Sequence, residues 1–402
     1  MNITISPCKL SGTVAAIPSK SVAHRALICA ALAAIQGGGK FEPPPEMLGL
    51  CRDIDATIDC LKSLGNGKPG LLGKTLHCGE SGSLLRFLLP IVGALGCGAE
   101  MRMEGRLPER PLTPLYEELV KNGLTLSPQG SNPLKVKGKL HGGHFFIDAG
   151  ISSQFISGLL FALPLLDAPE ASSIRLYGKT ESAAYVDMTL QMLARFGIKV
   201  HYDEACFIIP PKQTYVLPEN VSALNEGDWS NAAFWLAAGV LVTGLNDESA
   251  QGDRAIVHIL DSFMNTSDKV EEIAVDAADI PDLVPILAVA ATRYNRTTTI
   301  FNAERLRLKE SDRLAAITAM LNAMGADVSE NEDGLTIHGG SPLKGGCNVS
   351  ACNDHRIAMA AAIAATMCEN AVTIKDADCV DKSYPTFWED FRSLGGLAEV
   401  EA

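Results

Sequence analysis

The sequence predicts an α/β (α+β) protein of two domains, each built from three β/α units. A short polar or Gly/Ser-rich cluster followed by an unusually apolar helical run occurs six times in the 402 residues. Most of these runs precede an amphipathic helix, and short β-like runs follow some of those helices. The spacing is irregular, which excludes a solenoid, and each unit takes about one-sixth of the chain.

The six apolar runs are expected to form buried helices, because a helix that is apolar on all sides has no face for water. With their leading clusters they are IPSKSVAHRALICAALA from Ile17, GESGSLLRFLLPIVGAL from Gly79, DAGISSQFISGLLFAL from Asp148, EGDWSNAAFWLAAGVL from Glu226, AADIPDLVPILAVAA from Ala277 and CNDHRIAMAAAIAATM from Cys352.

The amphipathic helices are expected to cover these buried helices with one apolar stripe each. They are Ile54–Leu64, Leu115–Asn122, Val186–Phe196, Ala255–Met264, Asp312–Met324 and Phe387–Leu394. Several stop at a glycine, which readily adopts the left-handed backbone of a helix C-terminus. The β-like runs are Lys199–Tyr202, Cys206–Ile209 and Leu335–His338.

Composition and charge narrow the function classes. The formal net charge is −13, and no nucleic-acid partner is expected because such proteins need a basic surface. Residues Met1 to Leu10 do not read as a signal peptide. The longest apolar run, Phe155–Leu166, is broken by Pro164 and is too short to cross a membrane. The 11 scattered cysteines favour reduced thiols, so we expect a cytoplasmic protein.

The starts of the buried helices carry the candidate functional residues. Backbone N–H groups at a helix start are unsatisfied and carry a partial positive charge. Lys20, Arg25, Arg86 and Arg356 lie in or near such first turns. Capping alone explains the Ser, Asp and Asn at any single start. Several starts that converge with these cations would bind a small anion.

Individual motifs add donors to these cations. In SKSVAHR, Ser21 lies one turn before Arg25 and shares its helix face. In GESGSLLR, Gly82 lets the backbone approach a ligand closely. In LPERP, Arg110 offers a guanidinium that can clamp a carboxylate or phosphate. Each motif alone also fits a capped turn or a solvated side chain.

Two further helix starts hold neutral donors and an acid. SSQFISG places Ser152, Ser153 and Gln154 before an apolar run, and capping explains one serine but not the triplet. IPDLVP places Asp282 at the next such start. The helix dipole favours an acid there, and an acid that faces an anion site would handle a proton.

The segment RLRLKESDR is the most charged part of an otherwise apolar fold. It brings Lys309, Glu310 and Arg313 together, as in a site where cations bind an anion and an acid moves a proton. A solvated helix start is the alternative. In NDHR, His355 precedes Arg356 at the start of a very apolar helix, which favours a ligand role over a structural one.

The order of the motifs resembles that of one enzyme family, the 5-enolpyruvylshikimate-3-phosphate synthases (3-phosphoshikimate 1-carboxyvinyltransferases). The matching motifs are SKSVAHRA, GESGSLLRFL, LPERP, SSQFISGLL, EGDWSNAA, IPD, LKESDRL, NDHRIAMA and DKSYPTFW. The resemblance covers essentially the whole chain. It implies six β-α-β-α-β-β units, three per domain, with the active site in the interdomain cleft. The implied domains are residues 1–17 plus 226–402 and an inserted domain of residues 18–225.

The resemblance also implies a reaction and its binding residues. The enolpyruvyl group of phosphoenolpyruvate moves to the 5-hydroxyl of shikimate 3-phosphate through a tetrahedral intermediate, and phosphate is released, in the shikimate pathway to chorismate and the aromatic amino acids. Shikimate 3-phosphate would bind Lys20, Ser21, Arg25, Ser152, Ser153, Gln154, Ser182, Asp282 and Lys309, with Tyr185 nearby. Phosphoenolpyruvate would bind Lys20, Gly82, Arg110, Gln154, Arg313, Arg356 and Lys382.

Three of these residues, together with Glu310, are implied in catalysis. Glu310 is expected to move the proton at C3 of phosphoenolpyruvate. Asp282 and Lys309 are expected near the 5-hydroxyl, with Lys20 as an alternative, and the assignment of each proton transfer stays open.

No cofactor is required by the implied chemistry. His141 and His144 lack further ligands at metal spacing, so no metal site is expected. The chain departs from the family pattern at Glu80, where many members have Asn, and at Arg305. An acid beside the supposed phosphoenolpyruvate site should be protonated, ion-paired or turned away.

Three other functions remain as alternatives. The sister enzyme acts on UDP-N-acetylglucosamine, but its typical loop with a reactive cysteine is not found in this sequence. RNA 3′-phosphate cyclase fits poorly with the negative charge. A non-catalytic anion-binding protein would be expected to lose Glu310 or Asp282, and both are present. The chain is expected to act as a monomer on small-molecule substrates.

Overall fold

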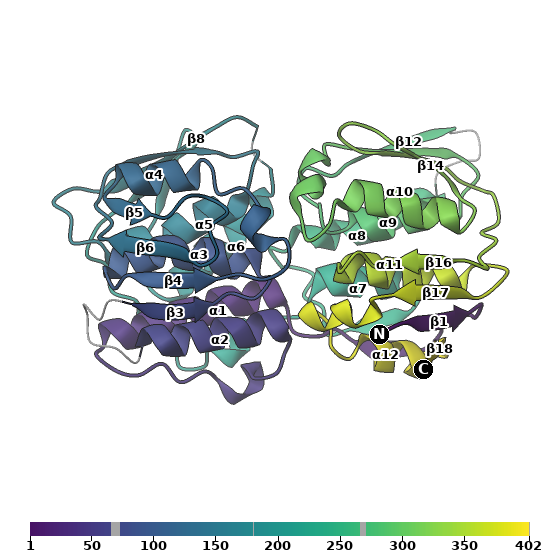
Figure 1. Cartoon of the computed structure of the whole chain (residues 1–402), viewed down its shortest axis with the longest axis horizontal. Coiled ribbons are helices and arrows are strands. Elements are labelled where there is room, and N and C mark those ends of the chain that lie inside the picture. The colour runs from purple at the N-terminus through teal and green to yellow at the C-terminus, as the bar shows by residue number, and fades with distance from the viewer. Residues whose placement is uncertain (66–72, 180, 266–270, 402) are drawn as a thin grey trace. The chain divides into compact units, whose positions relative to one another are not determined.

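A computed structural model describes residues 1–65, 73–179, 181–265 and 271–401. The chain divides into two compact units. The terminal unit comprises Met1–Ser19 and Glu226–Ala402, and the inserted unit comprises Lys20–Asn225. Each unit holds three pairs of α-helices in its described part (Figure 1).

The first helix of each pair is the apolar one, and all six apolar runs of the sequence form such helices. In the inserted unit these are α1 (Lys20–Gln36), α3 (Gly82–Leu95) and α5 (Ser153–Ala162). In the terminal unit they are α7 (Trp229–Ala237), α9 (Val284–Ala291) and α11 (His355–Thr366). Every residue of α9 is buried, as expected for a helix without a polar face.

The second helix of each pair is amphipathic, as the sequence predicts. These helices are α2 (Arg52–Gly65), α4 (Leu115–Lys121), α6 (Ala183–Arg195), α8 (Ile256–Asn265), α10 (Arg313–Ala323) and α12 (Phe387–Ser393). In α2, Ile54, Ile58 and Leu61 are buried, and their spacing places them on one face. The short 3₁₀ helices are Pro45–Met47, Leu107–Glu109, Leu163–Leu165, Ser222–Leu224, Gly252–Ala255, Glu304–Leu308 and Ala377–Lys382.

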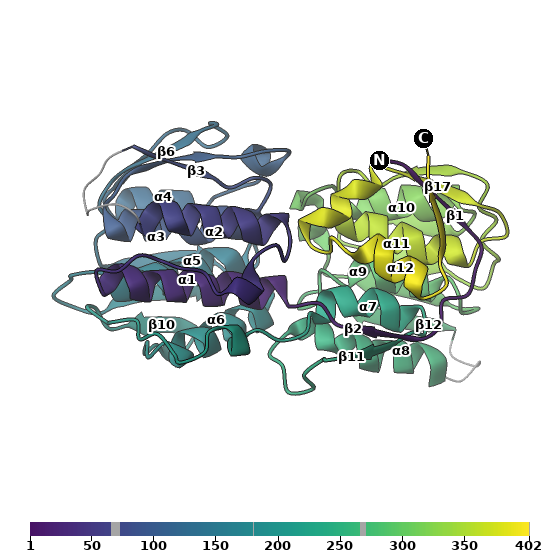
Figure 2. The same cartoon turned by 90° about the horizontal axis from the view of Figure 1, so that it is seen from below.

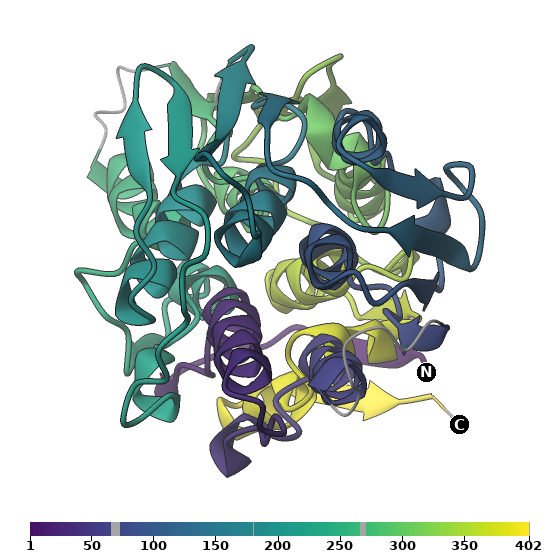
Figure 3. The same ribbon diagram turned by 90° about the vertical axis from the view of Figure 1, so that its left-hand side faces the viewer.

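Two four-stranded sheets of the inserted unit share one topology. The first contains β3 (Lys74–His77), β4 (Ala99–Arg102), β6 (Leu134–Gly138) and β5 (Leu124–Leu126), in that order. The second contains β7 (His144–Asp148), β8 (Ser172–Tyr177), β10 (Cys206–Ile209) and β9 (His201–Asp203). The first two strands pair in parallel and the others antiparallel. Figure 3 views this unit nearly along its helices, with strands on the outside.

The strand predicted at Lys199–Tyr202 begins two residues later than expected. The side chain of Gln213 accepts a hydrogen bond from the backbone N–H of Lys199 at 2.7 Å and donates one to the Lys199 carbonyl at 2.9 Å. These bonds occupy the backbone groups that would otherwise pair with a neighbouring strand. The other two predicted strands, Cys206–Ile209 and Leu335–His338, are confirmed.

The terminal unit repeats this topology twice. One sheet has the order β12 (Glu272–Asp276), β13 (Thr297–Phe301), β15 (Leu335–His338) and β14 (Asp327–Glu330). The other has the order β16 (Asn348–Ser350), β17 (Val372–Lys375), β1 (Ile3–Ser6) and β18 (Leu397–Val400). The first strand of the chain therefore lies in the third position of the last sheet, and the chain closes on itself near its two ends (Figure 1).

Within the described residues, the two remaining helix pairs have no four-stranded sheet. The α7–α8 pair is accompanied by the parallel pair β2 (Thr13–Ala15) and β11 (Leu241–Thr243), which lie side by side in Figure 2. The α1–α2 pair has no strand between its helices in the described residues. In the described chain the helix pairs thus repeat six times and the four-stranded sheet four times. Among those residues no helix is long and apolar enough to span a membrane.

Candidate active site

Arg313 organises a cluster of charges in the terminal unit. It is the first residue of α10 and its side chain is 1% exposed. Its guanidinium pairs with Asp282, Glu310 and Asp354, each at an N–O distance of 2.8 Å. Burial acts to lower the pKa of Arg313, but the three carboxylates raise it above its ordinary value. One buried cation therefore fixes three acids that lie far apart in the sequence.

Asp354 holds this cluster against the start of α11. It is fully buried and caps the helix, accepting a hydrogen bond from the backbone N–H of Arg356 at 3.0 Å. The hydroxyl of Ser311 also donates to it, at 3.1 Å. With Arg313 these donors occupy both carboxylate oxygens. Asp354 thereby positions the apolar helix whose second residue is Arg356.

Asp282 joins Arg313 to Arg356. Its Oδ1 lies 2.8 Å from Nη1 of Arg313, and its Oδ2 lies 3.0 Å from Nη2 of Arg356. Burial acts to raise the pKa of Asp282, but Arg356 and Arg313, together with Lys309, lower it below its ordinary value. A carboxylate held in this way accepts hydrogen bonds well but is a weak base.

Lys309 is the group beside Asp282 that is best suited to gain or lose a proton near neutral pH. Burial lowers the pKa of Lys309 to about 7, with Asp282 opposing the shift and Arg305 and Arg313 adding to it. An amine with such a pKa is present in both forms near neutrality, which suits acid–base work. The structure thus brings Asp282, Lys309, Glu310, Arg313 and Arg356 together in one unit, as a proton-handling anion site requires.

Lys382 reaches the same helix start from the 3₁₀ helix Ala377–Lys382. It is buried, and its Nζ donates to the carbonyl of Asn353 at 2.6 Å. Cys352 and Asn353 both have φ of 52°, a left-handed backbone that is costly for residues other than glycine. Such strain is typical of functional sites, and here it orients the carbonyl that binds Lys382.

Arg305, where the chain departs from the family pattern, contacts the backbone. Its Nη2 donates to the carbonyl of Ala278, which lies in the loop leading to Asp282. The side chain therefore braces that loop.

Lys20 and Arg25 of α1 are held inside the inserted unit. Lys20 pairs with Asp53 of α2 at 3.0 Å. Arg25 donates to the carbonyls of Ser21 at 2.6 Å and Tyr185 at 2.8 Å, and to the hydroxyl of Thr189 at 2.8 Å. Burial lowers the pKa of Arg25 to about 10. These bonds tie α1 to α6.

The start of α6 is itself unusual. Ser182 lies at its N-cap position with φ of 57°, and its side chain makes no capping hydrogen bond. An L-residue in this conformation costs roughly 1–2 kcal/mol. Because its hydroxyl does not cap the helix, Ser182 stays a candidate for binding a ligand.

Gln154 connects α5 to α3. Its Oε1 accepts from Nη1 of Arg86 at 2.6 Å, and its Nε2 donates to the hydroxyl of Ser83 at 2.8 Å. Ser152 caps α5 by accepting from the backbone N–H of Gln154, and Ser153 is buried beside it. The serine–glutamine triplet is thereby fixed by the neighbouring helix as well as by its own.

Arg110 lies directly on Gly82. A Cβ added to Gly82 would lie 2.7 Å from Nη1 and 2.9 Å from Cζ of Arg110. The missing side chain of Gly82 therefore leaves room for this guanidinium to approach the first turn of α3 closely. The two residues, predicted separately from the sequence, form one local arrangement.

Glu80 packs against Gly105 in the loop after β4. A Cβ added to Gly105 would lie 2.7 Å from Cδ of Glu80. Gly105 has φ of 53°, so only a glycine fits comfortably beside this carboxylate.

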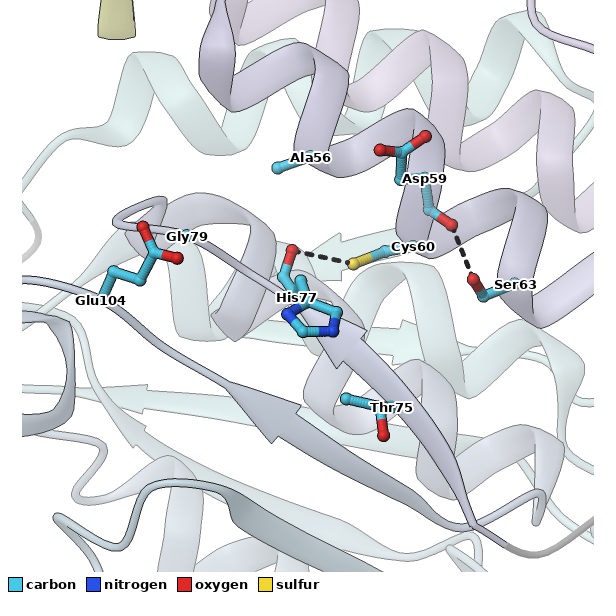
Figure 4. A pocket seen from close by; sticks show the side chains of 8 residues that line it. All are labelled: Ala56, Asp59, Cys60, Ser63, Thr75, His77, Gly79 and Glu104. Atoms are coloured by element: carbon cyan, nitrogen blue, oxygen red, sulfur yellow. Dashed lines mark hydrogen bonds between the residues drawn. The ribbon is translucent and has the colours of Figure 1, made fainter.

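One open pocket of the inserted unit holds none of the predicted site residues. Figure 4 shows it between α2 and β3, where the thiol of Cys60 donates to the carbonyl of His77 at 3.3 Å. Its lining also includes Ala56, Asp59, Ser63, Thr75, Gly79 and Glu104. The candidate site is identified by its charges and hydrogen bonds. In the described residues no group of three or more His, Cys, Asp or Glu is arranged to hold a metal ion.

Comparisons with known proteins decide the family. Residues 5–391 match the family described as EPSP synthase (3-phosphoshikimate 1-carboxyvinyltransferase). The chain is 44% identical to the 3-phosphoshikimate 1-carboxyvinyltransferase of Clostridium kluyveri, over 98% of this chain and 97% of that protein. The chain belongs to the EPSP synthase family.

Other comparisons agree with this family. The enzyme of the same name from Clostridium acetobutylicum is 42% identical over 98% of this chain and 97% of that protein. An EPSP synthase structure from Acinetobacter baumannii aligns with a TM-score of 0.74 over 100% of both chains at 22% identity, which shows the shared fold. The predicted family, fold class and enzyme class are thus confirmed. The sugar-nucleotide alternative is not favoured.

Sequence reasoning missed residues that position the site. Asp53, the partner of Lys20, lies in α2 and carries no motif of its own. Thr189 holds Arg25 from the other end of the inserted unit's sequence and was also missed. Tyr185, which the family resemblance does name, holds Arg25 through its backbone carbonyl. Asp354, in contrast, could be found from the sequence, because an Asp directly before an apolar helical run is an N-cap signal.

Proposed function

We propose that this EPSP synthase family member transfers the enolpyruvyl group of phosphoenolpyruvate to the 5-hydroxyl of shikimate 3-phosphate and releases phosphate. The family match over residues 5–391 carries this proposal. The substrates bear two phosphates and two carboxylates, and helix starts that carry Lys and Arg supply the charge that such anions need. The reaction leads to chorismate and the aromatic amino acids.

The residues implied by the family resemblance keep their proposed roles. Shikimate 3-phosphate binds Lys20, Ser21, Arg25, Ser152, Ser153, Gln154, Ser182, Asp282 and Lys309, and phosphoenolpyruvate binds Lys20, Gly82, Arg110, Gln154, Arg313, Arg356 and Lys382. The hydrogen bonds of Arg25 to Ser21, Tyr185 and Thr189 add a second role, which is to hold the start of α6 in place for Ser182.

The chemistry proceeds in two steps with balanced proton transfers. In the first, the 5-oxygen adds to C2 of phosphoenolpyruvate, its proton leaves, and C3 gains a proton. In the second, C3 loses a proton, the C2–O bond to phosphate breaks, and the enol ether forms. We assign the C3 proton to Glu310, which Arg313 holds at 2.8 Å.

Lys309 is our choice for the 5-hydroxyl proton. Its pKa of about 7 leaves a neutral amine available near neutrality. Asp282, whose pKa lies below the ordinary value because of Arg356, Arg313 and Lys309, serves better as a hydrogen-bond acceptor that orients the hydroxyl. Lys20 remains the alternative base.

No metal or organic cofactor takes part in this proposal. The enzyme acts as a monomer in the cytoplasm, on small molecules, without a nucleic-acid or membrane partner.

The test measures phosphate release from phosphoenolpyruvate by the purified protein without added metal. Shikimate 3-phosphate and UDP-N-acetylglucosamine are compared as acceptors. Release that depends on shikimate 3-phosphate is the expected result. Release with the sugar nucleotide, or with neither acceptor, would contradict the proposal.

A further inference from the structure

A buried acid outside the predicted set interacts electrostatically with Asp282 and Arg356 of the Arg313 cluster. Asp253, in the 3₁₀ helix Gly252–Ala255, is 2% exposed. Its Oδ2 accepts a hydrogen bond from the hydroxyl of Ser230 in the first turn of α7. Its Oδ1 has no hydrogen-bond partner in the described part of the chain. A charged oxygen in that position is costly, and protonation of the carboxyl removes the charge.

The surrounding charges act on Asp253 in the same direction. Burial and then Asp282 raise the pKa of Asp253 to about 7, with Asp228 adding to the rise and Arg356 and Ser230 opposing it. Other charged groups near it in sequence face water: Arg254 is exposed and donates to the carbonyl of Asp247, and His258 of α8 is exposed. The carboxyl of Asp253, which interacts electrostatically with Arg356, therefore gains or loses its proton near neutral pH.

The side chain of Gln251 holds the turn that carries Asp253. Two residues earlier, Gln251 is buried, and its Oε1 accepts from the hydroxyl of Ser19 and from the backbone N–H of Trp229, each at 3.1 Å. Its Nε2 donates to the carbonyl of Gly227 at 2.9 Å. Gln251 therefore fixes the turn of Asp253 to both segments at which the chain leaves and re-enters the terminal unit.

We propose that Asp253 is a positioning residue which, by holding a proton, leaves the guanidinium of Arg356 available to an anionic substrate. Asp282 already compensates part of the charge of Arg356, through the pair at 3.0 Å. A second carboxylate at Asp253 would compensate more of it and weaken the attraction for an anion. The inference rests on the proposed function, because that proposal assigns phosphoenolpyruvate to Arg356. Asp253 itself acts through Arg356.

The first test reads the proton directly and does not depend on activity. Infrared spectra of the whole protein are recorded from about pH 5.5 to about pH 8.5, a range centred on neutrality. A carbonyl band of a protonated buried carboxyl should fade near pH 7, and it should be absent in Asp253→Asn. Asp261→Asn, which removes an exposed carboxylate of α8, should keep the band. A wild-type spectrum without such a band overturns the proposal, whatever the enzyme's substrates are.

The second test follows KM for phosphoenolpyruvate over the same range. In the wild type KM should rise by about fivefold as Asp253 ionises, as expected for one added neighbouring charge. Asp253→Asn cannot ionise and should show a flatter rise. KM for shikimate 3-phosphate, whose site includes the titrating Lys309, should change alike in both proteins. An unchanged phosphoenolpyruvate profile in Asp253→Asn overturns the proposal.

Ser230→Ala provides a second variant, should Asp253→Asn fold poorly. The Ser230 hydroxyl lowers the pKa of Asp253, so its removal should move the midpoint of the infrared band to higher pH. The rise in KM should move with it. A midpoint that stays in place, or that falls, contradicts the assignment of the band to Asp253.

Discussion

The two units hold their buried arginines in different ways. In the terminal unit, Arg313 pairs with three carboxylates and Arg356 pairs with Asp282. In the inserted unit, Arg25 donates to two backbone carbonyls and a hydroxyl, and Arg86 donates to an amide oxygen and a carbonyl. Acids pair with Arg313 and Arg356 in the terminal unit, whereas neutral acceptors orient Arg25 and Arg86 in the inserted unit.

This difference indicates that the two kinds of arginine have different roles. A guanidinium oriented by neutral groups keeps its charge for an anion, which suits the binding of phosphate. A guanidinium balanced by acids fixes those acids in place and sets their proton affinity, which suits proton transfer. We therefore expect the loss of Arg313, which pairs with three acids, to lower stability strongly.

The largest expected effect comes from Arg313→Ala. The substitution leaves Asp282, Glu310 and Asp354 without their shared cation, and breaking a buried ion pair costs roughly 3–5 kcal/mol. The free energy of unfolding, measured with denaturant, should fall by about that amount. Arg307→Ala is the control, because Arg307 is half-buried and pairs with Asp312 and Glu330; it should lose less than about 1 kcal/mol. Equal losses of unfolding free energy in the two variants would contradict the role of Arg313 as the shared cation of three buried carboxylates.

Glu310→Gln should separate chemistry from binding. The variant cannot move a proton at C3, and loss of a general acid–base group typically lowers kcat by about 10²–10⁴-fold. KM for shikimate 3-phosphate should change little, since the assigned acceptor residues remain. Steady-state kinetics with both substrates check this. A kcat within about threefold of the wild type would remove Glu310 from the chemistry.

The parts of this architecture that the sequence predicts are the local ones. Val284–Ala291 is apolar on every side, so its burial follows from composition alone. The place of β1 between β17 and β18 does not follow, because Ile3 pairs with Ile374 and Val400. Only tertiary packing decides such partners at long sequence separation.

In the candidate site, too, the sequence predicts the local features but not the contacts between distant residues. Motifs of the sequence identify Arg25 and Arg313, because helix starts and charge clusters are local patterns. They do not indicate that Thr189 would hold Arg25. They also leave Asp253 unnoticed, because a single acid in a turn has no pattern of its own. Its significance comes from the burial that folding imposes.

Gly158→Ala tests the packing of the inserted unit. A Cβ at this position of α5 would overlap the carbonyl of Arg86 in α3 and lie 3.1 Å from Cγ of Pro90. Overpacking of this kind typically costs about 1–3 kcal/mol, and the backbone of α3 cannot move aside easily. The free energy of unfolding should fall by that amount, while Gly37→Ala, with no contact closer than 3.4 Å, should change it little. An unchanged stability in Gly158→Ala would show that the two helices separate readily.

Gly82→Ala should have the smallest effect on stability and a selective effect on binding. The added Cβ would meet Nη1 of Arg110 at 2.7 Å, and the end of a flexible side chain can move, so the fold should be kept. The displaced guanidinium would no longer lie on the first turn of α3, and we expect KM for phosphoenolpyruvate to rise by about tenfold, the equivalent of about 1.4 kcal/mol. KM for shikimate 3-phosphate should stay the same, because Arg110 is assigned to the other substrate. Equal changes in both KM values would mean that Arg110 serves both anions, and the proposed separation of the two binding sets would then fail.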